Sequence, residues 1–321
     1  MSKVVVIGAG YWGKNLVRTF HELGALAGVA EANLQLRESI TLLYPDIRLY
    51  EDYHPVLESD VSAIVIATPA QTHFTIAKEA LLKGKDVFVE KPMTLSLNEA
   101  EELVKLAESN KCIFMVGHLL LYQPAIQIMK ELITTGVIGT LHSLHQERLK
   151  LGKVRSVENV LWSFGVHDLA VLLYLVGEEP SWVQVNGQAM IQPITEDDIY
   201  LHLGFPNGVR AHLHTSWLWP ELQRRLVAIG SEGMLVYDEE AQTVTLHRKG
   251  INSDLSNRDE GAEVVYRGDK KPLSLECSHF LRCIQERQRP ISDGRSGLEV
   301  IRVLEKASHG VKEGDYDERL L

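Results

Sequence analysis

Short apolar runs alternate with helical stretches through the first 120 residues, and this alternation limits the fold more than any other feature of the chain. The apolar runs fall at residues 4–8, 26–32, 63–69, 86–92 and 112–117, and helical patterns occupy residues 12–23, 34–43, 73–84 and 96–109. Unbroken apolar strands separated by helices indicate parallel strands buried on both faces and joined by right-handed crossovers. We therefore predict a doubly wound parallel sheet over residues 1–120, with a capping box of Ser96 and Glu99 at its last helix.

The pattern changes after about residue 120. A helix is predicted over residues 124–134, and β-rich runs follow one another between residues 140 and 249, with a hairpin turn at residues 205–208. Residues 252–272 are polar and are predicted as a loop, and helices are predicted at residues 276–286 and 294–308. The fold class is thus α/β, with a second, α+β domain over residues 121–321 that contains a mostly antiparallel sheet.

Composition and charge narrow the function classes. The 321 residues are 45% hydrophobic and 24% charged, and their net charge of −10 argues against non-specific nucleic-acid binding. The three cysteines form no CxxC pair, so neither a disulfide framework nor a zinc site is expected. We see no secretory signal pattern and no apolar segment of membrane-spanning length, and we expect a cytoplasmic protein that does not contact membranes.

Gly8, Gly10 and Gly13 form a GxGxxG motif that directly follows an apolar run and opens a helix. This context is typical of a dinucleotide fingerprint, in which the first glycine permits a tight turn and the second lets the backbone approach a pyrophosphate. The third glycine allows the helix to pack closely on the strand. We predict that this turn, including the intervening Tyr11 and Trp12, binds a dinucleotide; a glycine-rich turn without a ligand is the alternative.

Glu31 ends the second apolar run, eighteen residues after Gly13. A carboxylate in this place accepts hydrogen bonds from the ribose hydroxyls of the adenosine and repels a 2′-phosphate, so NAD is favoured over NADP. Arg37 follows closely enough to soften that preference. A solvated charge at a strand end is the alternative interpretation of Glu31.

The next two apolar runs also end in residues of this kind, with Thr68 and Pro69 at the end of one and Glu90, Lys91 and Pro92 at the end of the other. In an open parallel sheet, ligands bind beyond the carboxyl ends of the strands. We therefore predict that these residues contact the cofactor and that Lys91 orients or protonates a substrate oxygen. Taken alone, Lys91 would more often be a surface lysine, and its position after a buried strand favours the functional role.

His167 and Asp168 interrupt an apolar stripe with helical spacing in the stretch VLWSFGVHDLAVLLYL, residues 160–175. Burial penalises charge, so an ionisable pair in such a stripe calls for an explanation. One is a core histidine that has found a polar partner. The other is a general acid/base that lines a pocket.

A basic stretch precedes this helix. It contains Arg148, Lys150, Lys153 and Arg155, and arginine suits bidentate contacts with phosphate or carboxylate. We predict substrate contacts from Arg148 and Arg155, with a solvated basic loop as an equally weighted alternative.

Further candidates lie near the basic stretch and among the histidines. Asn159 and Tyr122 are candidates to bind hydroxyl groups of a substrate, and Trp162 either flanks a nicotinamide or belongs to the core. His212 and His214 share one face of a predicted strand, but no carboxylate or cysteine completes a ligand set with them, so no metal is expected.

The glycine motif, the acidic strand end, the TP pair before His73 and the EKP motif together resemble the Gfo/Idh/MocA oxidoreductases over nearly the whole chain. The resemblance implies an N-terminal Rossmann domain that binds NAD(P), with His73 in its cofactor site, and a C-terminal domain with a large open sheet. It implies that Lys91 is catalytic or orienting and that His167 is the acid/base. The family's aspartate four residues before this histidine is replaced here by Ser163, which we expect to contact the substrate without supplying a charge.

Longer motifs resemble a narrower branch of this family. They are GHLLLYQPAI, RLKLGKVRSVENVLWSFGVHD, HTSWLWP and ECSHFLRCI. This resemblance implies NAD-dependent oxidation of the C3 hydroxyl of UDP-N-acetylglucosamine or its uronate, in bacterial surface-polysaccharide synthesis. It also implies a homo-oligomer, a dimer or tetramer that assembles through the C-terminal sheet. Three alternatives stay open: a dehydrogenase of a free sugar or inositol, an enzyme that recycles tightly bound NAD, and a non-catalytic nucleotide sensor.

Overall fold

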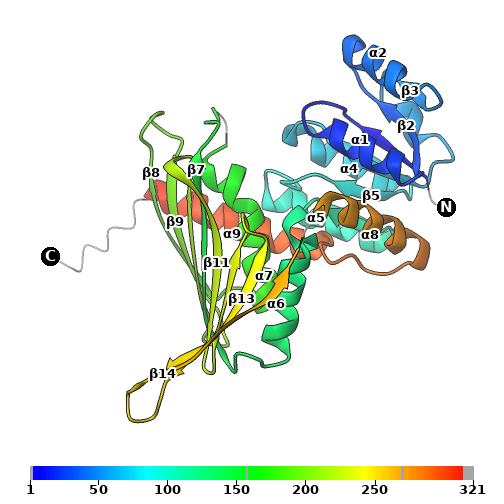
Figure 1. Cartoon of the computed structure of the whole chain (residues 1–321). Helices are drawn as coiled ribbons and strands as arrows, with labels where there is room; N and C mark the ends of the chain where they lie inside the picture. The colour runs from blue at the N-terminus through cyan, green and yellow to red at the C-terminus, as the bar shows by residue number, and fades with distance from the viewer. Residues whose placement is uncertain (1–2, 157, 269–270, 314–321) are drawn as a thin grey trace. The chain divides into compact units, whose positions relative to one another are not determined.

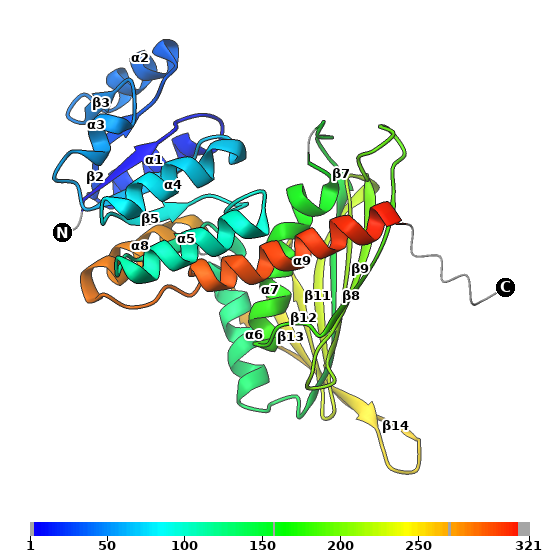
Figure 2. The ribbon, with the colours of Figure 1, turned by 180° about the vertical axis from the view of Figure 1, so that it is seen from behind.

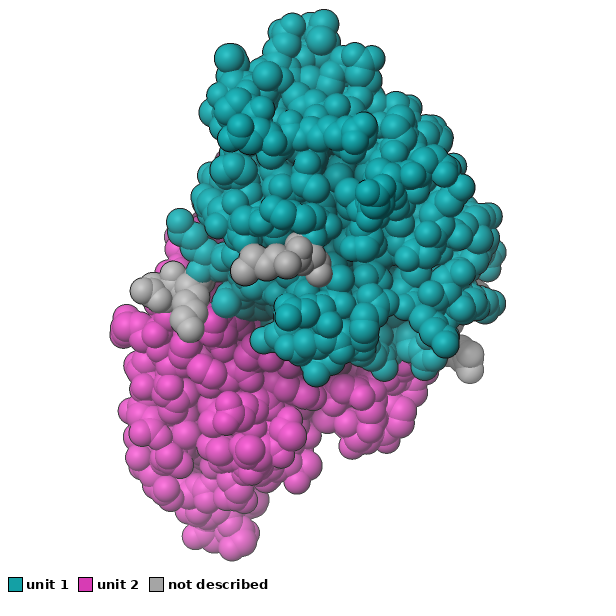
Figure 3. Space-filling view, turned by 90° about the vertical axis from the view of Figure 1, so that its right-hand side faces the viewer, with its two compact units in different colours: residues 1–122, 271–301 teal, residues 123–270, 302–321 magenta. Residues whose placement is uncertain are grey.

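The computed structural model describes residues 3–156, 158–268 and 271–313, and the chain divides into two compact units, coloured separately in Figure 3. Unit 1 comprises residues 1–122 and 271–301, and unit 2 comprises residues 123–270 and 302–321. The change of sequence pattern near residue 120 lies beside the first boundary. The assignment of residues 271–301 to unit 1 was not among the expectations from the sequence.

Unit 1 is built on a six-stranded parallel sheet of order β3-β2-β1-β4-β5-β6 (Figure 1). Its strands are β1 (Val4–Ile7), β2 (Leu26–Ala30), β3 (Arg48–Tyr50), β4 (Ala63–Ile66), β5 (Asp86–Val89) and β6 (Phe114–Val116). The strands β1, β4, β5 and β6 are buried at every residue, as their unbroken apolar runs require. The strand order reverses at β1, which confirms the predicted doubly wound fold.

Helices flank this sheet. They are α1 (Gly13–Glu22), α2 (Leu34–Leu43), α3 (His54–Leu57), α4 (His73–Leu82), α5 (Leu97–Ser109) and α8 (Pro272–Glu286), with 3₁₀ turns η1 (Ala70–Thr72) and η2 (Leu119–Tyr122). Within unit 1, α1 packs beside α8 and α4 packs beside α5. The predicted capping box at α5 is wrong, because the Ser96 side chain makes no capping hydrogen bond.

Unit 2 contains an eight-stranded sheet of order β14-β13-β12-β11-β7-β10-β9-β8. The strands are β7 (Leu141–Leu151), β8 (Trp182–Gln188), β9 (Asp198–Gly204), β10 (Arg210–Ser216), β11 (Leu218–Gly230), β12 (Met234–Asp238), β13 (Thr243–Ile251) and β14 (Asn257–Arg267). The β7–β10 pair is parallel and every other pair is antiparallel, so the prediction of a mostly antiparallel sheet is confirmed.

Three helices lie along one face of the unit 2 sheet (Figure 2). They are α6 (Pro124–Thr134), α7 (Val166–Val176) and the later part of α9 (Gly294–Glu313). A π-helical turn, η3 (Leu161–Gly165), directly precedes α7, so the apolar stretch from residue 160 is not one uniform helix. No helix in the described ranges is long and apolar enough to span a membrane.

The predicted loop over residues 252–272 is wrong, because β14 occupies its centre. This strand is at the edge of the sheet and pairs with β13 alone. Most of its side chains are exposed, so no alternation of apolar and polar residues marks it in the sequence.

Candidate active site

The glycine turn after β1 has the geometry of a cradle for a dinucleotide. Gly8 has a φ of +88°, and a Cβ there would lie 2.9 Å from the carbonyl oxygen of Ala67. A Cβ at Gly13 would lie 2.1 Å from the Gly8 oxygen, so this position requires glycine for packing. A Cβ at Gly10 would meet no atom within 4 Å, which leaves bare backbone facing open space. This is the arrangement that lets a pyrophosphate approach the turn.

A cavity of about 420 Å³ adjoins this turn at the carboxyl ends of β1, β2 and β4. The predicted cofactor residues that line it are Gly8, Gly10, Glu31, Thr68 and Pro69. Ligands of open parallel sheets bind at this edge, close to the point where the strand order reverses. The position and lining of the cavity therefore fit the adenosine half of NAD.

Glu31 is fixed by the backbone around it. One carboxylate oxygen accepts the N–H of Ala9 at 2.7 Å, and the other accepts the N–H of Asn33 at 2.9 Å. The guanidinium of Arg37 donates to the carbonyls of Glu31 and Ala32, both at 2.8 Å. Arg37 is thus held against the backbone, and the Glu31 carboxylate stands at the cavity wall, as recognition of ribose hydroxyls requires.

Replacing Glu31 by alanine should weaken NAD binding by roughly 10- to 100-fold, the loss expected for charge-assisted hydrogen bonds to a ligand. Calorimetric titration of both cofactors measures this effect. NADP binding should be unchanged or stronger, because the repelling carboxylate is gone. Equal weakening for NAD and NADP would instead mean that the variant has disturbed the glycine turn through Ala9.

The strand β5 ends in a polar loop that contains Glu90 and Lys91. Glu90 is 8% exposed, and its carboxylate oxygens accept the indole N–H of Trp12 at 2.5 Å and the backbone N–H of Lys91 at 3.2 Å. Burial raises the pKa of Glu90 to about 7, against the lowering effects of the Trp12 hydrogen bond and the Lys91 charge. A Cβ at Gly117 would lie 2.9 Å from this carboxylate, so only glycine fits beside it. Glu90 therefore holds the glycine turn and the Lys91 loop together.

His73 ties two loops at the same sheet edge. Its ring nitrogens lie 2.8 Å from the carbonyl oxygen of Pro92 and 2.9 Å from that of Thr68. The ring is 1% exposed, and its burial lowers the pKa of the histidine although both carbonyls favour the charged form. These bonds hold the Thr68 loop, which lines the cavity, to the loop of Pro92. Direct contact of His73 with the cofactor stays a prediction. Tyr11 is 88% exposed, and its predicted contact is equally untested.

Two residues at this edge escaped the sequence predictions: His118 and Glu276. His118 follows β6 and is 2% exposed, and neither ring nitrogen has a hydrogen-bond partner in the described structure. Burial and the charge of Lys91 lower the pKa of His118 to about 3, so the ring is neutral. The sequence did contain a signal for His118, because this histidine comes at the end of a predicted strand, as Lys91 does. Glu276 carried no such signal, because it lies within the apolar pattern of α8.

Replacing His118 by phenylalanine should preserve or raise the thermal midpoint, because two buried nitrogens without protein partners are removed. We expect NAD affinity or turnover to fall by roughly 10-fold, as for the loss of a hydrogen bond to a bound ligand. Thermal denaturation and steady-state kinetics measure the two effects. If the NAD affinity and the kinetics of the variant are unchanged, the His118 ring has only a packing role.

In unit 2, His167 lies half-buried in the first turn of α7, and its neighbour Asp168 is buried. The Asp168 carboxylate accepts the Nε–H of Arg148 at 2.5 Å and an amide N–H of Gln146 at 2.9 Å. Burial raises the pKa of Asp168 to about 6, and the Arg148 charge opposes that rise. Asp168 is thus paired with the side chains of Arg148 and Gln146 on β7. It does not substitute for the aspartate that the family resemblance implies at the position of Ser163.

Arg148 is 8% exposed and donates to Glu239 at 2.8 Å as well as to Asp168. Arg224 donates to the other Glu239 oxygen at 2.8 Å. This buried network occupies the Arg148 guanidinium, so its predicted contact with substrate gains no support. Arg155 is exposed, and its predicted contact remains untested.

The remaining substrate candidates have protein partners. Asn159 donates to Glu196 at 2.8 Å and accepts the backbone N–H of Trp162 at 3.1 Å. The Trp162 indole donates to Ser308 at 2.9 Å, and Ser163 is half-buried in η3. These contacts order the turn that precedes His167.

Tyr122 belongs to unit 1 and is 5% exposed. Its hydroxyl lies 2.8 Å from the Ser292 hydroxyl, and its ring lies beside that of His279 with the ring planes tilted by 50°. Tyr122 thus anchors η2 to the residues that return from the C-terminal part of the chain. Its predicted contact with a sugar is untested.

Histidines of neighbouring strands lie against one another in the unit 2 sheet. His202 and His212 face each other across β9 and β10 with ring nitrogens 2.7 Å apart, and His145 of β7 lies beside His212. No cluster of three or more metal-ligating side chains occurs within residues 3–156, 158–268 and 271–313.

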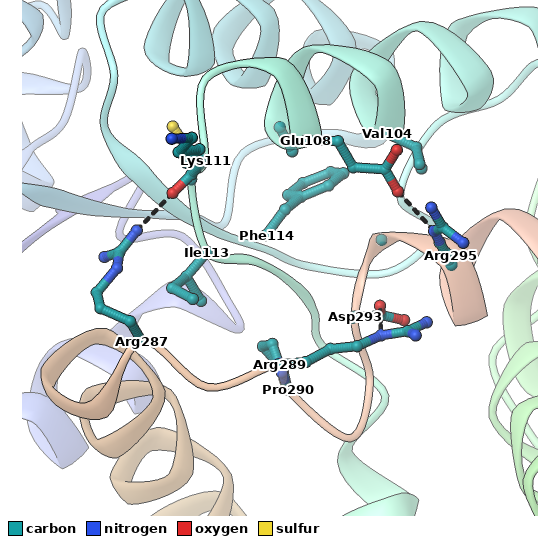
Figure 4. A pocket seen from close by; sticks show the side chains of 13 residues that line it. Val104, Glu108, Lys111, Ile113, Phe114, Arg287, Arg289, Pro290, Asp293 and Arg295 are labelled. Atoms are coloured by element: carbon teal, nitrogen blue, oxygen red, sulfur yellow. Dashed lines mark hydrogen bonds and ion pairs between the residues drawn. The ribbon is translucent and has the colours of Figure 1, made fainter.

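A larger cavity, of about 520 Å³, lies at the opposite edge of the unit 1 sheet, beside the start of β6 (Figure 4). Arg295 pairs with Glu108 at one side, and Arg287 donates to the Lys111 carbonyl at the other. Arg287 also pairs with Asp86 at 2.6 Å. These charges are matched within unit 1, and the cavity is remote from the carboxyl ends of the strands.

Comparison with known proteins identifies the family. A domain described as the oxidoreductase family's NAD-binding Rossmann fold matches residues 2–118, and the GFO/IDH/MocA C-terminal domain matches residues 126–236. A solved structure from Magnetospirillum magnetotacticum MS-1 is 31% identical over 95% of this chain and 98% of its own, with a TM-score of 0.82. The chain belongs to the Gfo/Idh/MocA oxidoreductase family. It is therefore an NAD-dependent oxidoreductase, and unit 1 supplies its NAD-binding domain.

Two further members of the Gfo/Idh/MocA family bear on the substrate. The UDP-N-acetylglucosamine 3-dehydrogenase of Acidithiobacillus ferrooxidans is 28% identical over 92% of this chain and 93% of its own length. Its solved structure has a TM-score of 0.87 and covers 97% of this chain and 98% of its own. The NAD-dependent scyllo-inositol 2-dehydrogenase of Bacillus subtilis is also 28% identical, over 75% of this chain and 73% of its own length.

Proposed function

We propose that this oxidoreductase transfers a hydride from the C3 hydroxyl carbon of UDP-N-acetylglucosamine, or of its uronate, to NAD and so produces a 3-keto sugar. The observation that carries this proposal is the similarity to UDP-N-acetylglucosamine 3-dehydrogenase, which extends over almost the full length of both chains. The inositol dehydrogenase is equally identical over a shorter part of this chain. The two relatives are equally identical in sequence to this chain. The greater length of the match to the UDP-N-acetylglucosamine enzyme therefore favours the nucleotide sugar as substrate.

The proposal assigns distinct roles to Lys91 and His167. Bound NAD supplies the hydride acceptor. An ordinary lysine amine is protonated at neutral pH, so Lys91 polarises the substrate oxygen by donating a hydrogen bond to it. His167 takes the hydroxyl proton, because an imidazole is the side chain best suited to act as a base near neutral pH. Gly8, Gly10 and Glu31 hold the cofactor.

The proposal is tested by following NADH formation when the protein and NAD are mixed with candidate substrates. These are UDP-N-acetylglucosamine, its uronate, free glucose-type sugars and inositol. An aminotransferase with its amino donor is added in parallel, because removal of the keto product draws the reaction forward. NADH with the nucleotide sugars alone supports the proposal. NADH with free sugars or inositol alone would keep the family chemistry and reject the substrate.

A second candidate function is internal recycling of a tightly bound NAD, and the observation that favours it is Ser163. Serine supplies no charge to hold a protonated His167, so proton transfer in this chain departs from the pattern that the family resemblance implies. The absorbance spectrum of the purified protein separates the two functions. Retained nicotinamide absorbance, with no exchange against added NAD, would favour recycling.

We also propose that the chain forms a homo-oligomer through the open face of the unit 2 sheet. Helices α6, α7 and the later part of α9 lie on the other face, and partly exposed His212 and His214 alternate along β10 with buried Ala211 and Leu213. Light scattering coupled to size-exclusion chromatography tests this proposal. A monomer at micromolar concentration would contradict it.

A further inference from the structure

Glu276 is a buried acid that the proposed mechanism leaves unused. It lies in α8 with 0% exposure, and neither carboxyl oxygen has a hydrogen-bond partner among the described residues. One turn later, Phe280 packs against Phe88 of β5 with ring centroids 5.7 Å apart. The helix that carries Glu276 is thus packed against β5, the strand that directly precedes Glu90.

The groups that interact electrostatically with Glu276 are acids or neutral. They are Glu90 after β5, Tyr122 of η2 and the adjacent Cys277. Burial and the negative charge of Glu90 raise the pKa of Glu276 well above its ordinary value. Two carboxylates in one buried site do not readily ionise together. The Trp12 hydrogen bond and the Lys91 charge lower the pKa of Glu90, so a proton on the pair favours Glu276.

The hydrogen bonds likewise favour an ionised Glu90 and a protonated Glu276. Both Glu90 oxygens accept N–H groups, from Trp12 and from the backbone of Lys91. An ionised carboxylate is an acceptor at both oxygens, whereas a protonated one must also place an O–H. Glu276 makes no such bonds and keeps its O–H available. Buried O–H groups require an acceptor, and a buried water can serve as the partner of a polar group that has none in the protein.

We propose that Glu276 is a positioning residue that acts as a neutral acid, donating its O–H toward Glu90 and so keeping Glu90 ionised as the counter-charge of Lys91. Glu276 touches neither substrate nor cofactor and acts through Glu90. The negative charge of Glu90 then offsets the positive charge of Lys91, with which it interacts. This inference rests on the proposed role of Lys91 in turnover.

Two substitutions test this role by kinetics. Glu276→Gln keeps a hydrogen-bond donor but cannot ionise, and we expect its turnover to stay within about threefold of the parent. Glu276→Leu removes the donor, and we expect turnover to fall by roughly 10-fold or more. In this variant Glu90 protonates at higher pH, so the acid limb of the pH–rate profile shifts upward. Phe280→Leu is the matched control on the same helix, and it should lower stability without moving that limb.

Two kinetic outcomes would overturn the proposal. Equal impairment of Glu276→Gln and Glu276→Leu would mean that Glu276 acts as a carboxylate. An unshifted pH profile in Glu276→Leu would mean that it does not act on Glu90.

Infrared spectroscopy of the full-length protein with NAD tests the protonation state without any substrate. We expect the C=O stretch of a protonated carboxylic acid at neutral pH, and we expect Glu276→Gln to lose it. Persistence of the whole band in that variant would overturn the proposal. If Glu276→Gln loses the band but no nucleotide sugar is oxidised by the parent protein, then Glu276 is a neutral acid as proposed and the proposed substrate is wrong.

Discussion

Replacing His167 by alanine is expected to lower turnover by roughly 10²- to 10⁴-fold, the usual contribution of a positioned general base. NAD binding should persist, because the glycine turn and Glu31 lie in unit 1 and His167 lies in unit 2. Pre-steady-state NADH formation with the best substrate of the panel measures the first effect, and calorimetric titration with NAD measures the second.

The matched control for this variant is His142→Ala. His142 lies exposed on β7 in the same unit and has no assigned role in turnover. It should keep its full rate. If His167→Ala retains most of its rate, the base is another group, and Lys91 becomes the first candidate.

Replacing Asp168 by alanine should lower the free energy of unfolding by about 3–5 kcal/mol, the cost of breaking a buried ion pair. The variant leaves the buried guanidinium of Arg148 with one carboxylate, Glu239, and deprives Gln146 of its acceptor. Urea denaturation followed by circular dichroism measures the loss.

An exposed pair provides the control for that prediction. Glu263 pairs with Arg248 where both side chains are about half exposed, at 56% and 50%. Glu263→Ala should therefore cost less than about 1 kcal/mol. Equal losses in Asp168→Ala and Glu263→Ala would contradict the account of a buried network in unit 2.

Local patterns explain why the fold of unit 1 was predictable. Its strands are continuous apolar runs, and the glycine motif lies between β1 and α1, so neighbours in sequence are neighbours in space. The edge strand β14 was not predictable, because its exposed side chains show no alternation. The π-helical turn before α7 was hidden because its apolar residues continue the stripe of the helix that follows it.

The site was predictable where one segment forms it and not where segments from distant parts of the chain meet. Gly8, Gly10 and Glu31 belong to a single βαβ unit and line the cavity as expected. Glu276 interacts with Glu90 across 185 intervening positions, and no spacing rule connects the two. Arg148 was predicted to contact the substrate, with a solvated basic loop as the alternative, but its strand neighbours and Asp168 enclose it.

We propose above all that this oxidoreductase removes the C3 hydrogen of a nucleotide sugar. Transfer of an isotope from C3 tests this claim most directly. UDP-N-acetylglucosamine with deuterium at C3 is mixed with the protein and NAD, and the reduced cofactor is analysed by mass spectrometry. We expect deuterium on the nicotinamide ring of the reduced cofactor and slower formation of this cofactor than with the unlabelled sugar. Reduced cofactor without deuterium, or no reduced cofactor from this sugar or its C3-deuterated uronate, would contradict the claim.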